Sequence, residues 1–107
     1  MLYKFKSKAT GDVIMLEPQG QQILKIIGKT PGPKGIIEPA EMMAAIEALH
    51  AAVARDEAAR AEARAQAEAQ GEAPPKDGGI HLRQRVVPFV DMLRRAHAEE
   101  ADVVWGV

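Results

Sequence analysis

The histidines that could bind a metal are few in this chain and lie far apart. The histidines are His50, His81 and His97; no two of them stand four residues apart, and none belongs to an H-E-x-x-H motif. The sequence has no cysteine, which excludes disulfides, thiolate nucleophiles and cysteine metal ligands. A site built from His50, His97 and an acid would require their two helices to pack face to face. We predict that the histidines lie at the surface or at the boundary of the core and that the protein holds no metal and no cofactor.

Side chains that could act as nucleophiles in catalysis are also few. Hydroxyl side chains other than that of tyrosine occur at Ser7, Thr10 and Thr30. None of them has a histidine nearby in sequence or lies in a nucleophile elbow. The segment GKT at residues 28–30 is similar to the end of a P-loop, but position 23 is isoleucine where that motif needs glycine. We predict no catalytic residue, and the alternative of an anion held by Lys29 and Lys34 stays open.

The most suggestive charged group consists of four arginines, namely Arg83, Arg85, Arg94 and Arg95. On a continuous helix, with about 100° per residue, Arg83 and Arg94 fall within about 20° of each other. One interpretation is an arginine-lined patch for an acidic partner or a phosphate. The other, which we favour, is that the arginines cover the polar side of a buried helix. They would then pair with Asp91, Glu99 or an acidic central helix.

That central helix is predicted at residues 38–53. Its large apolar side chains recur at steps of four, three and four, at Met42, Ile46, Leu49 and Val53. Pro39 suits the first helical position, where a missing N–H costs nothing, and Glu41 lies in the first turn. Glu38 is a weaker capping residue than threonine would be. The helix must bury its apolar stripe against the short strand-like segments on either side.

A second apolar stripe predicts a helix near the carboxyl end. It comprises Leu82, Val86, Phe89, Leu93 and Ala96. Pro88 lies inside it, so two interpretations are open. Either the helix begins near Arg83 and bends at Pro88, or residues 80–85 are extended and the helix starts at Val87. We favour the first, because the stripe continues through the proline without a change of phase.

Four short segments predict a small sheet. Residues 2–7 alternate, with Tyr3 and Phe5 on one face and the lysines on the other. Residues 13–16 are apolar and are expected to form a more interior strand, paired antiparallel with the first, whose lysines would protect an exposed edge. Residues 36–37 and 103–105 are expected to complete the sheet. A short helix, opened by Pro18 and ended by Gly28, follows the second strand.

The terminal strand carries the single tryptophan, Trp105. This side chain is expected either to cover the core or to act as an exposed interface anchor. A terminal edge strand with a large aromatic residue and few charges pairs readily across a two-fold axis. Homodimerisation through this edge is therefore one expectation, and Trp105 joins the four arginines as a candidate interaction residue.

The middle of the chain loses its apolar stripe after Val53. From residue 54 to residue 79 there is no Leu, Ile, Val, Met or aromatic residue, and residues 71–79 are rich in glycine and proline. We interpret residues 54–79 as a solvated helical extension and linker within one domain spanning residues 1–107. The predicted fold class is α+β: a small sheet covered mainly on one face by about three helices, with an exposed Ala/Glu/Arg-rich helix extension.

Charge is unevenly distributed along the chain. Residues 1–37 contain six lysines against two acids, whereas residues 38–72 contain eight acids against three arginines, and the formal net charge of the chain is −1. Scattered lysines of this kind favour a solvated sheet over a nucleic-acid interface. No segment approaches the roughly 20 apolar residues needed to span a bilayer, and the amino terminus has no signal-peptide pattern. We expect a cytoplasmic protein with neither membrane nor nucleic-acid partners.

The ordered segments resemble a family of small proteobacterial proteins that is classed as a domain of unknown function. The resemblance rests on LYKFKS at residues 2–7, DVIML at 12–16, GK at 28–29, GII at 35–37, LRQR at 82–85, Pro88, ML at 92–93 and VWG at 104–106. It implies a bacterial protein but no functional residue. We expect a non-catalytic protein-interaction or adaptor module, with a protein partner or a second copy. The alternative is a small-ligand or anion-binding protein, or an accessory enzyme subunit, that uses Lys29, Lys34 and the arginines.

Overall fold

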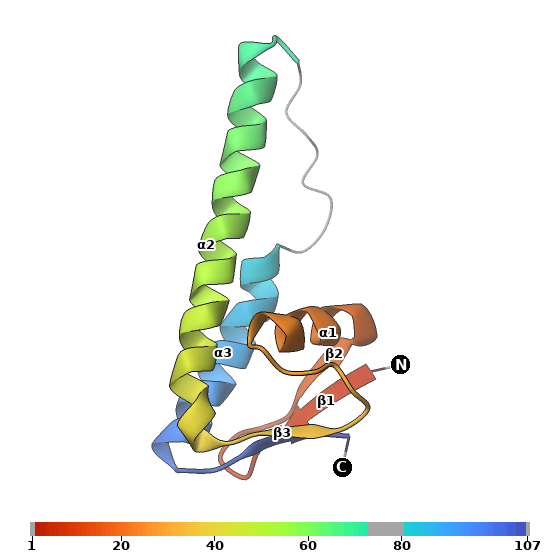
Figure 1. The fold of residues 1–107 in the computed structure, drawn as a ribbon, viewed down its shortest axis with the longest axis vertical. Helices are drawn as coiled ribbons and strands as arrows, with labels where there is room; N and C mark the ends of the chain where they lie inside the picture. Colours follow the sequence, from red (N-terminus) through yellow and green to blue (C-terminus); the bar gives the residue numbers. More distant parts are fainter. Residues whose placement is uncertain (1, 73–80, 107) are drawn as a thin grey trace.

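The computed structural model describes residues 2–72 and 81–106. Within them the chain forms four strands and three helices (Figure 1). In chain order these are β1 (Leu2–Lys6), β2 (Val13–Leu16), α1 (Glu17–Ile26), β3 (Gly35–Ile37), α2 (Pro39–Ala69), α3 (Leu82–Ala98) and β4 (Val103–Trp105). The predicted α+β fold class is confirmed. Most of the predicted linker, from residue 73 onward, lies outside the described residues.

The strands form one antiparallel sheet in the order β2-β1-β4-β3. The predicted antiparallel pairing of the first two strands is confirmed, and Tyr3 lies opposite Met15. The prediction that residues 13–16 form an interior strand is wrong, because β2 lies at an edge and β1 lies between β2 and β4. The lysines of β1 therefore do not protect an edge.

Strand β4 also lies inside the sheet, between β1 and β3. The expectation that the terminal strand offers an edge for a dimer is wrong, since hydrogen-bonding partners occupy both of its sides. Antiparallel pairing brings Phe5 opposite Trp105 on one side and Gly35 opposite Trp105 on the other. The carboxyl end of the chain thus joins segments that lie far apart in the sequence.

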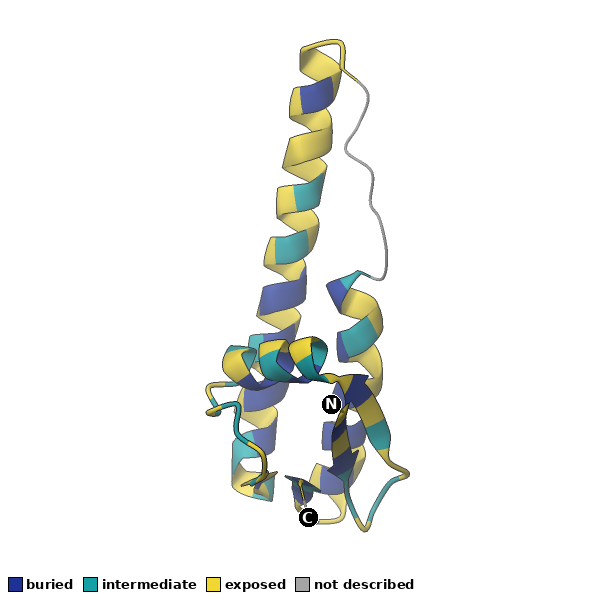
Figure 2. Ribbon diagram, turned by 90° about the vertical axis from the view of Figure 1, so that its right-hand side faces the viewer, coloured by how far each residue is buried: buried dark blue, intermediate teal, exposed yellow. Residues whose placement is uncertain are grey.

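The helices cover one face of this sheet (Figures 1 and 2). In β1, Tyr3 and Phe5 are buried on that face while Leu2 and Lys4 are exposed on the other, as the alternation predicted. At the centre, the rings of Phe5 and Phe89 meet edge to face, with their centroids 4.8 Å apart. Aromatic rings favour this arrangement, since the positive edge of one meets the negative face of the other. The core therefore joins β1 to α3.

Helix α1 begins and ends as its sequence predicted. Pro18 lies in its first turn, and Ile23 and Leu24 are fully buried against the sheet. Gly28 adopts φ = 82°, and the N–H of Lys29 donates to the carbonyl of Leu24 at 2.8 Å. A residue with positive φ that ends a helix in this way is usually glycine, because it has no Cβ to clash.

Helix α2 is the longest element, with 31 residues. Its apolar stripe is buried, and Leu49 is fully inaccessible to solvent. At its start, the Glu41 carboxylate accepts a hydrogen bond from the N–H of Glu38 at 2.8 Å, which satisfies one of the free donors of the first turn. Beyond Val53 the helix continues past the body of the protein (Figure 2). From residue 54 to residue 72, one residue, Ala67, is buried.

Helix α3 runs through Pro88 without interruption, from Leu82 to Ala98. The favoured interpretation, a helix that begins before the proline, is therefore confirmed. Pro88 has no N–H, so the carbonyl of Gln84 loses its usual partner one turn earlier in the helix. Pro88 is exposed, and water can satisfy that carbonyl. The buried face of α3 includes Phe89 and Leu93, both fully inaccessible, and it packs against α2 and the sheet.

Candidate functional site

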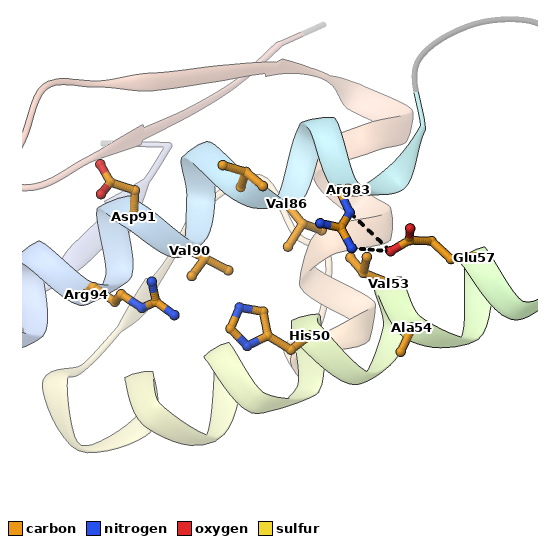
Figure 3. A pocket seen from close by; sticks show the side chains of 10 residues that line it. His50, Val53, Ala54, Glu57, Arg83, Val86, Val90, Asp91 and Arg94 are labelled. Carbon is orange, nitrogen blue, oxygen red and sulfur yellow. Dashed lines mark hydrogen bonds and ion pairs between the residues drawn. The ribbon is translucent and has the colours of Figure 1, made fainter.

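A groove of about 360 Å³ lies between α2 and α3 (Figure 3). We call it the helix groove. Its floor consists of Val53, Val86 and Val90, which are 7%, 2% and 4% exposed. The remaining lining residues are His50, Ala54, Glu57, Arg83, Val87, Asp91 and Arg94. An apolar floor with a few polar side chains around it is the usual composition of a ligand site.

The apolar stripes of α2 and α3 explain why these residues lie together. Val53 ends the stripe of α2, and Val86 belongs to the stripe of α3. Positions that flank a stripe on each helix border the seam where the helices meet, so charged side chains there form the rim of the groove. Arg83 and Arg94 both line it, in agreement with their predicted angular separation. The sequence therefore contained the signal that these two arginines share one side of α3.

An ion pair closes one end of the helix groove. The Nε atom of Arg83 donates to the Glu57 carboxylate at 3.1 Å, and a second guanidinium nitrogen donates to the same oxygen (Figure 3). The two side chains are 62% and 46% exposed, so solvent screens the pair and its net contribution is about 0–1 kcal/mol. The pair neutralises Arg83 and joins the helical extension of α2 to the start of α3.

At the other end, Arg94 points toward His50 (Figure 3). Neither side chain forms a hydrogen bond or an ion pair with another residue in the described part of the chain. Asp91 also lines the groove, but Arg95 holds its carboxylate at 3.1 Å. The guanidinium of Arg94 therefore keeps its full donor capacity beside an apolar floor.

The four candidate arginines do not form one site. Arg83 and Arg95 are paired with Glu57 and Asp91, as our favoured interpretation of this group expected. Arg94 lies in the helix groove, and Arg85 lies on a different face of α3, in a second groove. Each arginine thus has its own surroundings.

Trp105 is not an exposed interface anchor. It is 2% exposed, and its Nε1 donates to the carbonyl of Gly32 at 3.1 Å. The same carbonyl accepts a hydrogen bond from the Tyr3 hydroxyl at 3.3 Å. Gly35 lies directly under the indole ring, where a Cβ atom would collide with it. Trp105 therefore covers the core and fixes the loop before β3.

The face of the sheet opposite the helices carries an apolar patch that the sequence interpretation missed. Leu2, Ile14 and Leu16 are 59%, 57% and 59% exposed. They adjoin one another, because Leu2 pairs with Leu16 across β1 and β2 while Ile14 and Leu16 alternate along β2. The signal was present in β2, whose four residues are all apolar although an edge strand usually carries polar residues on its solvent face. We call these three residues the apolar patch.

A second groove, of about 450 Å³, runs beside the edge of β2, and we call it the strand groove. One side of it consists of β2 itself. The other side consists of residues from α1 and α3, namely Gln19, Gln84, Arg85 and Pro88. Arg85 forms no ion pair with any side chain whose position is described. The edge strand, the apolar patch and an unpaired arginine thus lie next to one another.

Lys29 is engaged in a different interaction. Its Nζ lies 2.5 Å from the Glu41 carboxylate at the start of α2. This hydrogen bond, together with the N–H of Glu38, holds the pKa of Glu41 below its ordinary value. Lys29 therefore links the loop after α1 to the amino end of α2, and Lys34 is an exposed residue of the following loop. The two lysines line neither groove.

Within residues 2–72 and 81–106, no group of three or more His, Asp or Glu side chains could hold a metal ion. His50 and His97 are exposed, and His81 is half-buried at the start of α3. Among the helices whose positions are described, none has the length and apolar character to cross a bilayer.

The described chain has a small α+β fold whose surface bears the helix groove and the strand groove. By sequence the chain belongs to the family described as Domain of unknown function (DUF1840), whose model matches residues 1–105. No curated protein and no solved structure shows significant similarity to it. The predicted membership of a domain of unknown function is thus confirmed.

Proposed function

We propose that this protein is a non-catalytic interaction module of the bacterial cytoplasm. It binds an extended segment of a protein partner, which adds as a fifth strand to the free edge of β2. The observation that carries the proposal is the apolar patch beside that edge. Contiguous exposed apolar side chains at the surface of a small domain are characteristic of protein–protein contact sites. The patch residues are each more than half exposed, so the protein gains by covering them.

The backbone of β2 supplies the hydrogen bonds for such a partner. In the described sheet β2 pairs with β1 alone. Alternate residues of an antiparallel strand direct both N–H and C=O to the same side, so about half of β2 presents these groups away from β1. An added strand would satisfy them, while its alternate side chains would cover Ile14 and Leu16 or enter the strand groove.

Arg85 determines which segment fits. Its guanidinium lines the strand groove without an ion pair inside the described chain, so it favours a partner segment with an acidic side chain at the matching position. Two copies paired through β2 about a two-fold axis would instead bring two like charges to the shared edge. The charge therefore favours a different protein over a second copy of this chain.

The partner can be identified and the surface tested in one series of experiments. A photoreactive amino acid placed at position 14 in cells of the native host would capture the bound segment, which mass spectrometry then identifies. A synthetic peptide of that segment is titrated by fluorescence anisotropy against the wild type and against Ile14→Gln/Leu16→Gln. Burial of one large aliphatic side chain is worth about 1.5–3 kcal/mol, so the double variant should bind at least about tenfold more weakly.

Met43→Gln is the matched control, because Met43 is an apolar side chain of α2 with a similar exposure, 52%. It should leave the affinity unchanged, whereas Arg85→Glu should weaken binding. All variants should unfold at the wild-type urea concentration, since the replaced side chains are largely solvated. Equal affinities for the double variant and the wild type would refute the proposal. So would capture of another copy of this chain together with sedimentation as a dimer.

A further inference from the structure

The helix groove supports an inference that is independent of strand addition. We infer that it binds a small aliphatic monocarboxylate, with the carboxylate held at Arg94 and His50 and the hydrocarbon chain lying along the valine floor. The strand groove uses a different face of α3, through Gln84, Arg85 and Pro88. Either site can therefore fail experimentally without affecting the other.

The charged end of the groove is built for an acid. Arg94 presents a planar fork of N–H donors that matches the two oxygens of a carboxylate. It has no ion pair within the described residues, and it points toward His50, which is likewise without a hydrogen-bonding partner there. The nearest acid of α3, Asp91, does not cancel this charge because Arg95 already neutralises it at 3.1 Å. A ligand carboxylate therefore meets uncompensated donors at this end.

The floor of the groove sets the character of the rest of the ligand. Val53, Val86 and Val90 form an apolar floor without a hydrogen-bonding side-chain atom, and Val87, which is 58% exposed, adds apolar surface at the rim. From Arg94 to Val86 the helix rises about 12 Å, at 1.5 Å per residue, which suits a medium-length hydrocarbon chain. At the far end the Arg83–Glu57 pair is already neutralised. The groove therefore accommodates one carboxylate and not two.

The dimensions favour a small molecule over a protein segment. A volume of about 360 Å³ lies within the range of about 300–1,000 Å³ typical of small-ligand sites. Charged side chains stand at both ends of the valine floor, so the occupant must be short (Figure 3). A long amphipathic helix would have to pass over the Arg83–Glu57 pair and leave it partly desolvated, which costs free energy.

Octanoate is a suitable probe, and NMR of the valine methyl groups is a direct measurement. Titration of the full-length protein should shift the methyl signals of Val53, Val86 and Val90 saturably. Octylamine, which has the same chain with a positive head group, should not bind, and octanol should bind at least about tenfold more weakly. The expected difference follows from the hydrogen bonds of a charged group, which contribute more than neutral ones.

Two arginines of the same helix provide matched variants. Arg94→Gln should weaken octanoate binding about tenfold or more and leave octanol binding unchanged. Arg85→Gln should leave octanoate binding unchanged, because Arg85 lies outside the helix groove. The same two variants should show the reverse order of effects with the partner segment of the strand groove. Failure of one site is thereby distinguished from failure of the other.

Three results would overturn the inference. The first is the absence of valine methyl shifts with octanoate. The second is equal binding of octanoate and octylamine, which would remove the role of the carboxylate. The third is a wild-type dimer that becomes monomeric on Val87→Asp. Val87 is 58% exposed at the rim of the groove, so that result would mean that a second copy covers it.

Discussion

Replacement of Gly20 by alanine has two effects of opposite sign on the free energy of unfolding, and their balance can be worked out from the structure. Gly20 lies inside α1, where alanine is favoured over glycine by about 1 kcal/mol through helix propensity. A Cβ atom at this position would, however, lie 2.6 Å from Cγ and 2.8 Å from Cβ of Tyr3, whereas ordinary contact begins at 3.4 Å. The Cβ atom of Tyr3 keeps its place in every rotamer, so rotation of the tyrosine side chain alone cannot relieve the clash.

Relief of the clash requires α1 to move away from β1. That movement would open the core around Ile23 and Leu24, which are fully buried beneath α1. Overpacking of this kind costs about 1–3 kcal/mol, and the lost contacts beneath α1 add to it. We expect Gly20→Ala to lower the free energy of unfolding by about 1–2 kcal/mol after the propensity gain is included. The melting temperature should fall by several degrees, at roughly 4–8 °C per kcal/mol for a small domain.

Urea unfolding followed by circular dichroism and by fluorescence of the single tryptophan, Trp105, measures this quantity. The matched control is the pair Gln22→Ala and Gln22→Gly, at an exposed position of the same helix. The difference between these two variants gives the propensity effect in α1 without a clash, with alanine the more stable. A Gly20→Ala protein more stable than the wild type by that same amount would refute the close packing of α1 on Tyr3.

Three further predictions concern the core, one ion pair and one hydrogen bond. Leu49→Ala should lower the unfolding free energy by about 2–5 kcal/mol, because it leaves a cavity in the core. Ala63→Gly, in the exposed extension of α2, should change the midpoint of the main urea transition by much less. Equal shifts of the midpoint would contradict the assignment of the core to the first half of α2. Glu41→Gln should destabilise the protein at pH 7. Because Lys29 lowers the pKa of Glu41 in the folded state, the charged carboxylate stabilises the fold above its unfolded-state pKa, and this contribution is lost as the pH falls through the lowered value. Urea curves of the variant and the wild type should therefore differ at pH 7, and the difference should shrink as the pH is lowered through that value. Tyr3→Phe should cost about 0.5–1.5 kcal/mol through the lost hydrogen bond to a loop carbonyl, and an unchanged urea midpoint would show that the bond contributes nothing.

The candidate sites could be predicted from sequence only in part. The shared side of Arg83 and Arg94 followed from helical geometry, because their spacing is a property of one helix. The pairing of Arg83 with Glu57 did not follow from it, because this pair depends on the position of α2 along α3. The exposure of Ile14 and Leu16 was missed for a similar reason. A continuous apolar run does not show whether helices cover one face of its strand or both, and the packing of the helices on the sheet decides which of its residues stay exposed.

Local periodicity determined most of the elements of this protein. The two stripes, the alternation of β1 and the glycine after α1 predicted three helices and the first strand pair, because each pattern depends on residues within a few turns of one another. The tertiary structure decided where β4 lies. Its insertion between β1 and β3 depends on hydrogen bonds between opposite ends of the chain and on the burial of Trp105 over Gly35. The position of a strand within a sheet depends on packing and loop closure between distant segments, so it cannot be predicted from a short-range sequence pattern.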